Sequence, residues 1–288
     1  MYPANPFTLN YEKRIVAFLD VMGFQNLLAN NEDSKRRLEK YYAEAMKYLN
    51  SKTNAYSANA PQDDFKKMFV SDSIILSVRI SGDNDEDLLR MGRFISTVGQ
   101  LQAHLASKAC IWTRGAISIG NLHIDEYLHV LVGQAFVNAY ELEKIADYPR
   151  VIIDPTALRH FNHHTNAFIS FMDKLDYRSY LLGPNQPSKN GLPPFSNEAI
   201  QVDWFRHLYS EHDPLEEYFR DLIERQHSNQ SLFTKTQKLI RYFVESHLHH
   251  SERRYFQIRE DLVFGARYNY IVNHLSQITT FINKHDVI

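Results

Sequence analysis

The chain has a single cysteine, Cys110, among its 288 residues. One thiol excludes an internal disulfide framework and any metal site built from several cysteines, and it is typical of a reducing compartment. We expect Cys110, which comes just before an apolar strand pattern, to lie in the core. No apolar run of about 18 residues occurs, and residues 1–14 have no signal-peptide core. We therefore expect a cytoplasmic protein without a membrane partner.

An excess of charge of one sign is also missing. The sequence has 32 Lys and Arg against 34 Asp and Glu, which gives a formal net charge of −2. We expect no nucleic-acid partner, because such proteins carry a basic patch that binds phosphates. Hydrophobic residues make up 44% of the chain, enough to form a core. The composition is that of a globular protein.

Several enzyme motifs are missing as well. The chain has no Walker-type glycine loop, no Gly-x-Ser-x-Gly elbow and no His-Glu-x-x-His helix. Histidines cluster at residues 160–164 and 247–250, without the cysteine or carboxylate partners of a zinc site. We interpret both clusters as surface histidines.

Strand-like and helix-like segments alternate between residues 11 and 158. Short apolar runs predict strands and hairpins, and apolar residues spaced three and four apart predict helices. Strands are expected at residues 14–19, 68–70, 74–76, 110–120, 123–124, 128–132 and 151–153; helices are expected at 35–49, 83–105 and 136–146. This order predicts an α/β (α+β) domain in which helices pack on a mixed sheet.

The remainder of the chain differs in character. Residues 159–197 predict a connecting segment that ends in a proline-rich loop. Residues 198–288 have helical periodicity with many aromatic and charged residues, and predict a helical C-terminal extension that packs on the first domain.

Two acids stand at the ends of predicted strands. Asp20 follows a buried strand and precedes Gly23 and Phe24, where a helix is expected to begin; Asp72 occupies the tip of a predicted hairpin. Two carboxylates at one end of a sheet suit a pair of Mg²⁺ or Mn²⁺ ions, and the N–H groups of Met22, Gly23 and Phe24 suit a phosphate. Taken singly, each acid also fits an ordinary cap or turn.

Three further polar residues follow along the chain. Arg114 interrupts a strand pattern beside two glycines, which indicate close backbone approach or a bulge. Asn138 lies on the helix that follows Gly133. Arg150 leads into the last strand, where it suits either a phosphate contact or the solvated surface.

Four segments in this order resemble the catalytic domain of class III nucleotidyl cyclases. They are Phe-Leu-Asp-Val-Met-Gly-Phe at 18–24, Val-Ser-Asp-Ser at 70–73, Arg-Gly-Ala-Ile-Ser-Ile-Gly at 114–120, and Val-Gly-Gln-Ala-Phe-Val-Asn-Ala-Tyr-Glu-Leu-Glu at 132–143. The last segment and Tyr-Pro-Arg-Val-Ile-Ile-Asp at 148–154 are most similar to the bacterial Pycsar cyclases of anti-phage defence, which make cyclic pyrimidine nucleotides.

The resemblance implies a ferredoxin-like catalytic domain over residues 11–158. It implies a homodimer with shared active sites, in which Asp20, Asp72 and the Val21 carbonyl hold two Mn²⁺ or Mg²⁺ ions. The turn at Met22, Gly23 and Phe24 would hold the nucleoside triphosphate together with Arg150. The ribose 3′-hydroxyl would attack the α-phosphate and release pyrophosphate.

The sequence departs from the purine-cyclase pattern in two places. Purine cyclases carry an Asn and then an Arg on the dimerisation helix. Here Asn138 stands one place off that register and the arginine position falls on Tyr140 or Glu141, so that Arg114 or Arg150 would replace the missing arginine. The two adenine-reading positions, a Lys and an Asp, fall on Met68 and Val130, although Lys67 is only one residue away.

A pocket without the adenine-reading pair disfavours ATP. The resemblance therefore implies a uridylate cyclase, with cytidylate cyclase, a purine cyclase or a non-catalytic nucleotide-binding or interaction module as alternatives.

Overall fold

The computed structural model describes residues 8–28, 31–146, 148–161, 168, 172, 181–182 and 200–204. The chain divides into two compact units, the first comprising residues 1–181 and 199–204, and the second residues 182–198 and 205–288. The predicted helical extension lies outside the described residues beyond Trp204. The predicted boundaries at 158 and 197 stay predictions.

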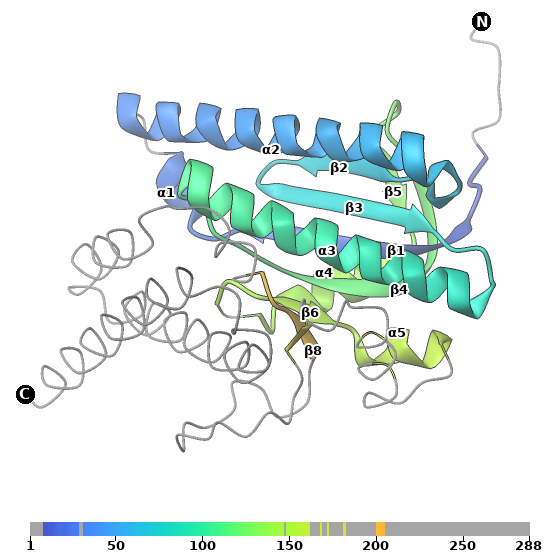
Figure 1. The fold of residues 1–288 in the computed structure, drawn as a ribbon. Coiled ribbons are helices and arrows are strands. Elements are labelled where there is room, and N and C mark those ends of the chain that lie inside the picture. Colours follow the sequence, from blue (N-terminus) through green and yellow to red (C-terminus); the bar gives the residue numbers. More distant parts are fainter. Residues whose placement is uncertain are drawn as a thin grey trace, which may run out of the picture. The chain divides into compact units, whose positions relative to one another are not determined.

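The first unit is organised around an 8-stranded sheet with the order β2-β3-β1-β4-β6-β8-β7, in which β5 pairs with β4 (Figure 1). The strands are β1 (Glu12–Val21), β2 (Lys66–Val70), β3 (Ser73–Arg79), β4 (Thr113–Asp125), β5 (Val130–Val132), β6 (Val151–Ile153), β7 (Leu181–Leu182) and β8 (Ile200–Val202). Strands β2, β3, β1 and β4 pair antiparallel in that spatial order. With helices between β1 and β2 and between β3 and β4, this is the ferredoxin-like arrangement that the resemblance implies.

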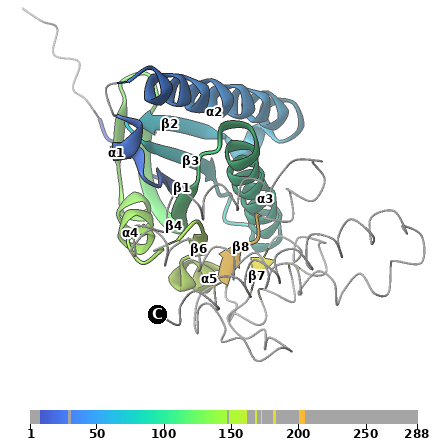
Figure 2. The same cartoon turned by 90° about the vertical axis from the view of Figure 1, so that its left-hand side faces the viewer.

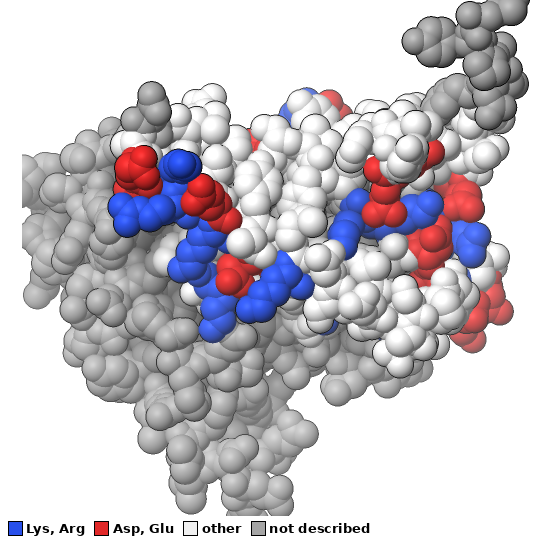
Figure 3. All heavy atoms as spheres, turned by 90° about the horizontal axis from the view of Figure 1, so that it is seen from above, with Lys and Arg blue, Asp and Glu red and all other residues white. Residues whose placement is uncertain are grey.

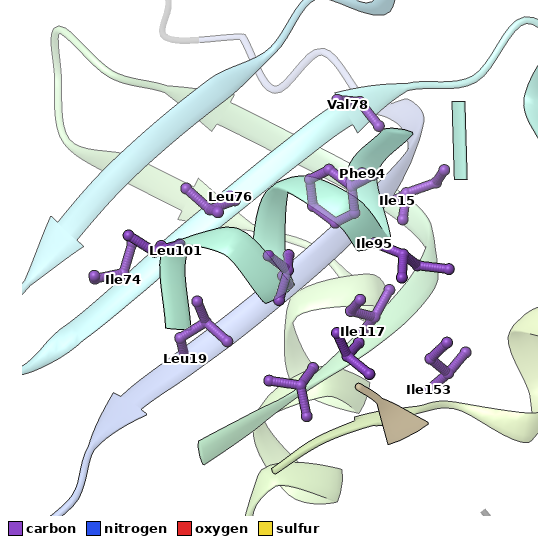
Figure 4. Close-up of a cluster of buried hydrophobic side chains, with 14 of the residues drawn as sticks. Ile15, Leu19, Ile74, Leu76, Val78, Phe94, Ile95, Leu101, Ile117 and Ile153 are labelled. Atoms are coloured by element: carbon purple, nitrogen blue, oxygen red, sulfur yellow. The ribbon is translucent and has the colours of Figure 1, made fainter. Parts of the chain in front are cut away.

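Two long helices, α2 (Glu32–Asn59) and α3 (Asn84–Ala109), lie on one face of the sheet (Figures 1 and 2). Each begins at a side-chain cap: Asn31 accepts from Ser34 N, and Asp83 accepts from the N–H groups of Asp85 and Glu86. The inward residues of both helices pack against alternate residues of β1 and β3 in the main core. Figure 4 shows this for α3, whose Phe94, Ile95 and Leu101 lie against these strands. This packing fixes the strand ends that carry the candidate site.

The opposite face of the sheet is covered in part by α4 (Gln134–Glu143). Phe18 of β1 makes edge-on ring contacts with Phe136 and Tyr140 of α4, at centroid distances of 5.8 and 5.4 Å. Residues of β1 with even numbers therefore face α4, while their odd-numbered neighbours face α2 and α3. Asp20 belongs to the α4 face.

Three short helical segments complete the described part: α1 (Phe24–Leu27), η1 (Pro61–Asp63) and α5 (Pro155–His160). The predicted alternation of strands and helices is confirmed, with two notable differences. Helix α2 begins at Glu32 and continues ten residues past Leu49, where its apolar spacing weakens, to Asn59. Strand β8 joins the sheet although its residues fall within the segment predicted as a helical extension.

The prediction that Cys110 lies in the core is wrong. Cys110 is exposed and ends α3 in the left-handed conformation, with φ 53°. The apolar pattern after it belongs to Ile111 and Trp112, which are buried, and β4 starts only at Thr113. Cys110 is therefore the exposed residue that ends α3, and it is not part of the buried strand that follows.

The charged side chains on the α2 side occur in two groups separated by uncharged residues (Figure 3). Lys and Arg lie beside Asp and Glu in both groups, so this face of the described surface gathers no charge of one sign. Among the described residues, no helix is long and apolar enough to cross a membrane.

Candidate active site

The two candidate metal carboxylates lie at the same end of the sheet. Asp20 pairs with Ser73 of β3 on one side and with Arg114 of β4 on the other, and Asp72 directly precedes Ser73. Burial, and after it the negative charges of Asp72 and Glu143, raise the pKa of Asp20 from 3.8 to about 6, although Arg114 lowers it. Three carboxylates thus act electrostatically on one another around a single guanidinium.

Two tyrosines of α2 hold the hairpin that presents Asp72. Tyr42 donates its hydroxyl to the Ser71 carbonyl at 2.7 Å, and Tyr41 donates to the Asp72 carbonyl at 3.4 Å. Ser71 has φ 55°, a left-handed conformation that such bonds help to maintain. The sequence predicts a helix over residues 35–49, which includes Tyr41 and Tyr42, but it does not predict these hydrogen bonds. Their adjacency could not reveal the bonds, which depend on where α2 crosses the hairpin.

Arg114 links the two sides of the site. Its Nη2 atom lies 3.4 Å from Asp20 Oδ2, and its Nε atom lies 2.5 Å from Glu143 Oε1 at the end of α4. Burial raises the pKa of Glu143, while Arg114 and Lys144 lower it. Sequence reasoning noted Glu143 only as a helix residue, because its role depends on where α4 ends relative to β4.

Gly115, next to Arg114 in the chain, is required by a close approach of two strands, one of the two explanations that the sequence suggests. A Cβ atom on Gly115 would lie 2.1 Å from the Phe18 carbonyl oxygen and 2.8 Å from Leu19 Cδ2. Only glycine allows β4 to approach β1 this closely. The close approach sets Arg114 directly opposite Asp20.

The turn after β1 fits the predicted phosphate site only in part. Met22 donates its N–H to the Trp112 carbonyl at 2.8 Å, so this group serves the sheet and is not a phosphate donor here. Gly23 adopts the left-handed conformation with φ 71° and precedes α1, which begins at Phe24. The first N–H groups of a helix have no carbonyl partner within it, so those of Gly23 and Phe24 remain the candidates.

Arg150 is not the solvated residue that one interpretation expected. Its exposed fraction is 7%, its guanidinium stacks 4.6 Å over the Tyr148 ring, and its Nη2 donates to the Ile145 carbonyl at 3.1 Å. These contacts tie Arg150 to the segment between α4 and β6. Its assignment to the triphosphate stays a prediction.

Three other predicted residues make contacts of their own, and none of these contacts is with Arg114. Asn138 accepts from Gln134 Nε2 at 2.7 Å, within α4. Val130 pairs with Asp125 in the β4–β5 hairpin. Met68 is buried on the α4 face of β2, where it belongs to the same apolar cluster as Phe18.

The site has the charge that a cation requires. Asp20, Asp72 and Glu143 lie around Arg114, and the raised pKa of Asp20 reflects its burial first and the charges of the other two carboxylates second. Carboxylate oxygens are the ligands that Mg²⁺ and Mn²⁺ prefer. Among the described residues, no three His, Cys, Asp or Glu side chains converge closely enough to hold an ion by themselves. The donor set of two carboxylates and a carbonyl therefore suits an ion that also binds substrate phosphates.

No protein-family model and no curated relative matches the chain. Solved structures with a similar arrangement include the adenylyl cyclase CyaB from P. aeruginosa, with 14% identity, a TM-score of 0.37, and coverage of 68% of this chain and 94% of that one. A class III adenylyl cyclase-like ATP-binding protein from Pseudomonas aeruginosa has 12% identity and a TM-score of 0.39; the match covers 58% of this chain and only 40% of that chain.

A third similar structure is the non-canonical dimeric guanylyl cyclase domain of the RhoGC fusion protein from the aquatic fungus Blastocladiella emersonii. It has 12% identity and a TM-score of 0.35, with coverage of 68% of this chain and 96% of that one. Likenesses at these levels do not bear on activity. The fold is assigned from the strand order itself and does not depend on these likenesses.

Proposed function

We propose that the protein is a metal-dependent nucleotidyl cyclase that converts UTP to 3′,5′-cyclic UMP and pyrophosphate. The observation that carries this proposal is the placement of Asp20 and Asp72 at one sheet end, where burial and the charge of Asp72 help to raise the pKa of Asp20 to about 6. Two repelling carboxylates beside a turn at which the N–H groups of Gly23 and Phe24 precede or begin a helix suit a divalent ion and a triphosphate bound together.

The reaction forms a bond between the ribose 3′-oxygen and the α-phosphorus and breaks the bond from that phosphorus to the bridging oxygen of pyrophosphate. Bound Mn²⁺ or Mg²⁺, two per site, would lower the pKa of the hydroxyl and neutralise phosphate charge. Asp20, Asp72 and the Val21 carbonyl would hold these ions. Gly23 and Phe24 would orient the phosphates, and Arg114 would stabilise negative charge that grows in the transition state.

The environment of β2 supports a pyrimidine substrate. Met68 occupies the position where the resemblance implies a base-reading lysine, and its side chain is buried among apolar residues. Lys67 points to the other face of the sheet, where its Nζ donates to Asn50 at 2.6 Å and Thr53 at 3.1 Å. If the match with the family pattern were moved by one residue, so that Lys67 took the base-reading position, its side chain would still lie on the face of the sheet opposite Met68. UTP is favoured over CTP on the resemblance alone.

The α4 face supports the proposal of a homodimer with shared active sites. Val137 and Tyr140 on α4 are 46% and 41% exposed, and Tyr127 at the tip of the β4–β5 hairpin is 90% exposed. Burying such side chains against a second copy is favourable. In the setting that the resemblance implies, the cyclic nucleotide would be an infection signal in bacterial anti-phage defence.

One observation favours a second candidate, a nucleotide-binding module without catalysis. The guanidinium of Arg114 already lies between Asp20 and Glu143, and Arg150 is stacked on Tyr148. If neither arginine reaches the substrate, the fold would bind a triphosphate and leave it unchanged.

The test is to incubate the full chain with each of the four ribonucleoside triphosphates and Mn²⁺, and to identify the products by mass spectrometry. The expected result is cyclic UMP, with no product from the Asp20→Ala variant. Cyclic CMP alone would move the assignment to a cytidylate cyclase, and a purine product would show that the base assignment is wrong. Retention of every triphosphate, together with measurable UTP binding, would establish the non-catalytic module.

A further inference from the structure

The helix α4 carries no cation where the resemblance implies an arginine. The ring of Tyr140 packs edge-on against Phe18 at 5.4 Å. Glu141 is exposed and forms an ion pair with Lys144 at 2.8 Å. Both positions are therefore committed to contacts that supply no positive charge to the strand ends. The positive charge at the site comes from β4 instead, as Arg114.

What α4 contributes is a carboxylate. Glu143 is the last residue of the helix, and its side chain is 5% exposed. Its Oε1 lies 2.5 Å from Arg114 Nε in an ion pair; both atoms are shielded from solvent, and neither makes a hydrogen bond within the described residues. Nη2, on the same edge of the guanidinium as Nε, lies at the longer distance of 3.4 Å from Asp20 Oδ2.

From this arrangement we infer that Glu143 is a positioning residue for Arg114, an inference that rests on the proposed function. Glu143 retains the Nε atom of the guanidinium and leaves only Nη2 directed toward Asp20. Without Glu143, Arg114 would be free to form a bidentate pair with Asp20, the geometry that a guanidinium and a carboxylate prefer. Such a pair would occupy the oxygens that are to hold a cation and would draw the arginine away from the phosphates.

A purely structural role explains the pair less well. Buried ion pairs contribute little net stability, because desolvation offsets the Coulomb attraction. Glu143 also lies close enough to Asp20 to raise the pKa of that carboxyl. A third carboxylate adds repulsion to this group of acids, and its presence is explained if it orients the guanidinium of Arg114.

The first test is independent of turnover. The Nε–H group of Arg114, shielded from solvent, should give a resolved, slowly exchanging ¹⁵Nε–¹H NMR signal, assigned by its loss in Arg114→Lys. The signal should shift or exchange at least tenfold faster in Glu143→Gln, an isosteric change. It should be unchanged in the matched control Glu141→Gln, which removes an exposed carboxylate from the same helix. A signal unaffected by Glu143→Gln would overturn the inference.

The second test measures turnover in a double-mutant cycle. Glu143→Gln should lower kcat at least tenfold, whereas in the Arg114→Gln background it should change kcat less than twofold. An equal loss of kcat on Glu143→Gln in both backgrounds would contradict a positioning role for Glu143. If Glu143→Gln does not fold, Arg114→Lys takes its place, because it retains the charge but has no Nε, and it should show the same loss. A wild-type chain without any product would refute the proposed function, while the NMR signal would still decide the inference.

Discussion

Replacing Asp20 with Asn should stabilise the metal-free protein. Burial and the charges of Asp72 and Glu143 raise the pKa of Asp20 from 3.8 to about 6, so the ionised carboxylate is unfavourable in the folded state at pH 7. A rise of about 2 pH units corresponds to about 3 kcal/mol, at 1.4 kcal/mol per unit. Because the Asp20 side chain is partly exposed and the substitution also removes the Arg114 contact, we expect a gain of about 1 kcal/mol.

The sign of the pH dependence follows from the raised pKa. Below about pH 4, Asp20 is protonated in both the folded and the unfolded chain, so Asn and Asp should be equivalent there. Between pH 4 and 6 the folded chain holds the proton more strongly, and the wild type loses stability as the pH rises. The advantage of Asp20→Asn should therefore appear over this interval and be complete above pH 6.

Thermal unfolding with a chelator present, followed between pH 4.5 and 7.5, measures this advantage. About 1 kcal/mol corresponds to a midpoint roughly 2–4 °C higher for Asp20→Asn at pH 7.5, for a domain of this size. Asp33→Asn, at an exposed position in the first turn of α2, is the control and should show no such gain. A lower midpoint for Asp20→Asn at pH 7.5, or an advantage that grows toward low pH, would refute the reasoning.

Three further outcomes are expected from single substitutions. Gly115→Ala should destabilise the fold by at least about 3 kcal/mol, visible as a lower thermal midpoint, since its Cβ would lie 2.1 Å from the Phe18 carbonyl; an unchanged midpoint would contradict the close strand approach. Tyr42→Phe should cost about 1 kcal/mol of stability and lower turnover, because it removes the bond to the Ser71 carbonyl; equal turnover would show that this bond does not position the hairpin. Lys67→Met should leave the preference among the four triphosphates unchanged in a competition assay, whereas a changed preference would place Lys67 at the base.

The strand and helix order was accessible from the sequence because it depends on local periodicity. The runs at residues 14–19 and 74–76 become the centres of β1 and β3, and the acids that follow or precede them lie together because those strands pair. Glycine spacing in β4 likewise indicated close approach, and Gly115 shows it. Patterns of this kind record which face a residue occupies.

Contacts between segments far apart in the chain could not be predicted from the sequence. Glu143 meets Arg114 only because α4 ends beside the start of β4, and the periodicity of α4 does not specify that position. Arg14, fully buried at the start of β1, hydrogen bonds to Ser77 and forms ion pairs with Glu12 and Asp64. A charged residue in a strand pattern gives no sign of such partners before the fold brings them together.

The central claim is that Asp20 and Asp72 together hold the cation needed for cyclisation, and the turnover of Asp72→Ala tests it most directly. The Asp72 carbonyl accepts from Tyr41 through the main chain, so alanine should leave the hairpin, the thermal midpoint and the oligomeric state intact. With UTP and Mn²⁺, we predict that product formation falls below detection while the folded state is retained. Turnover equal to that of the wild type would contradict the assignment of Asp72.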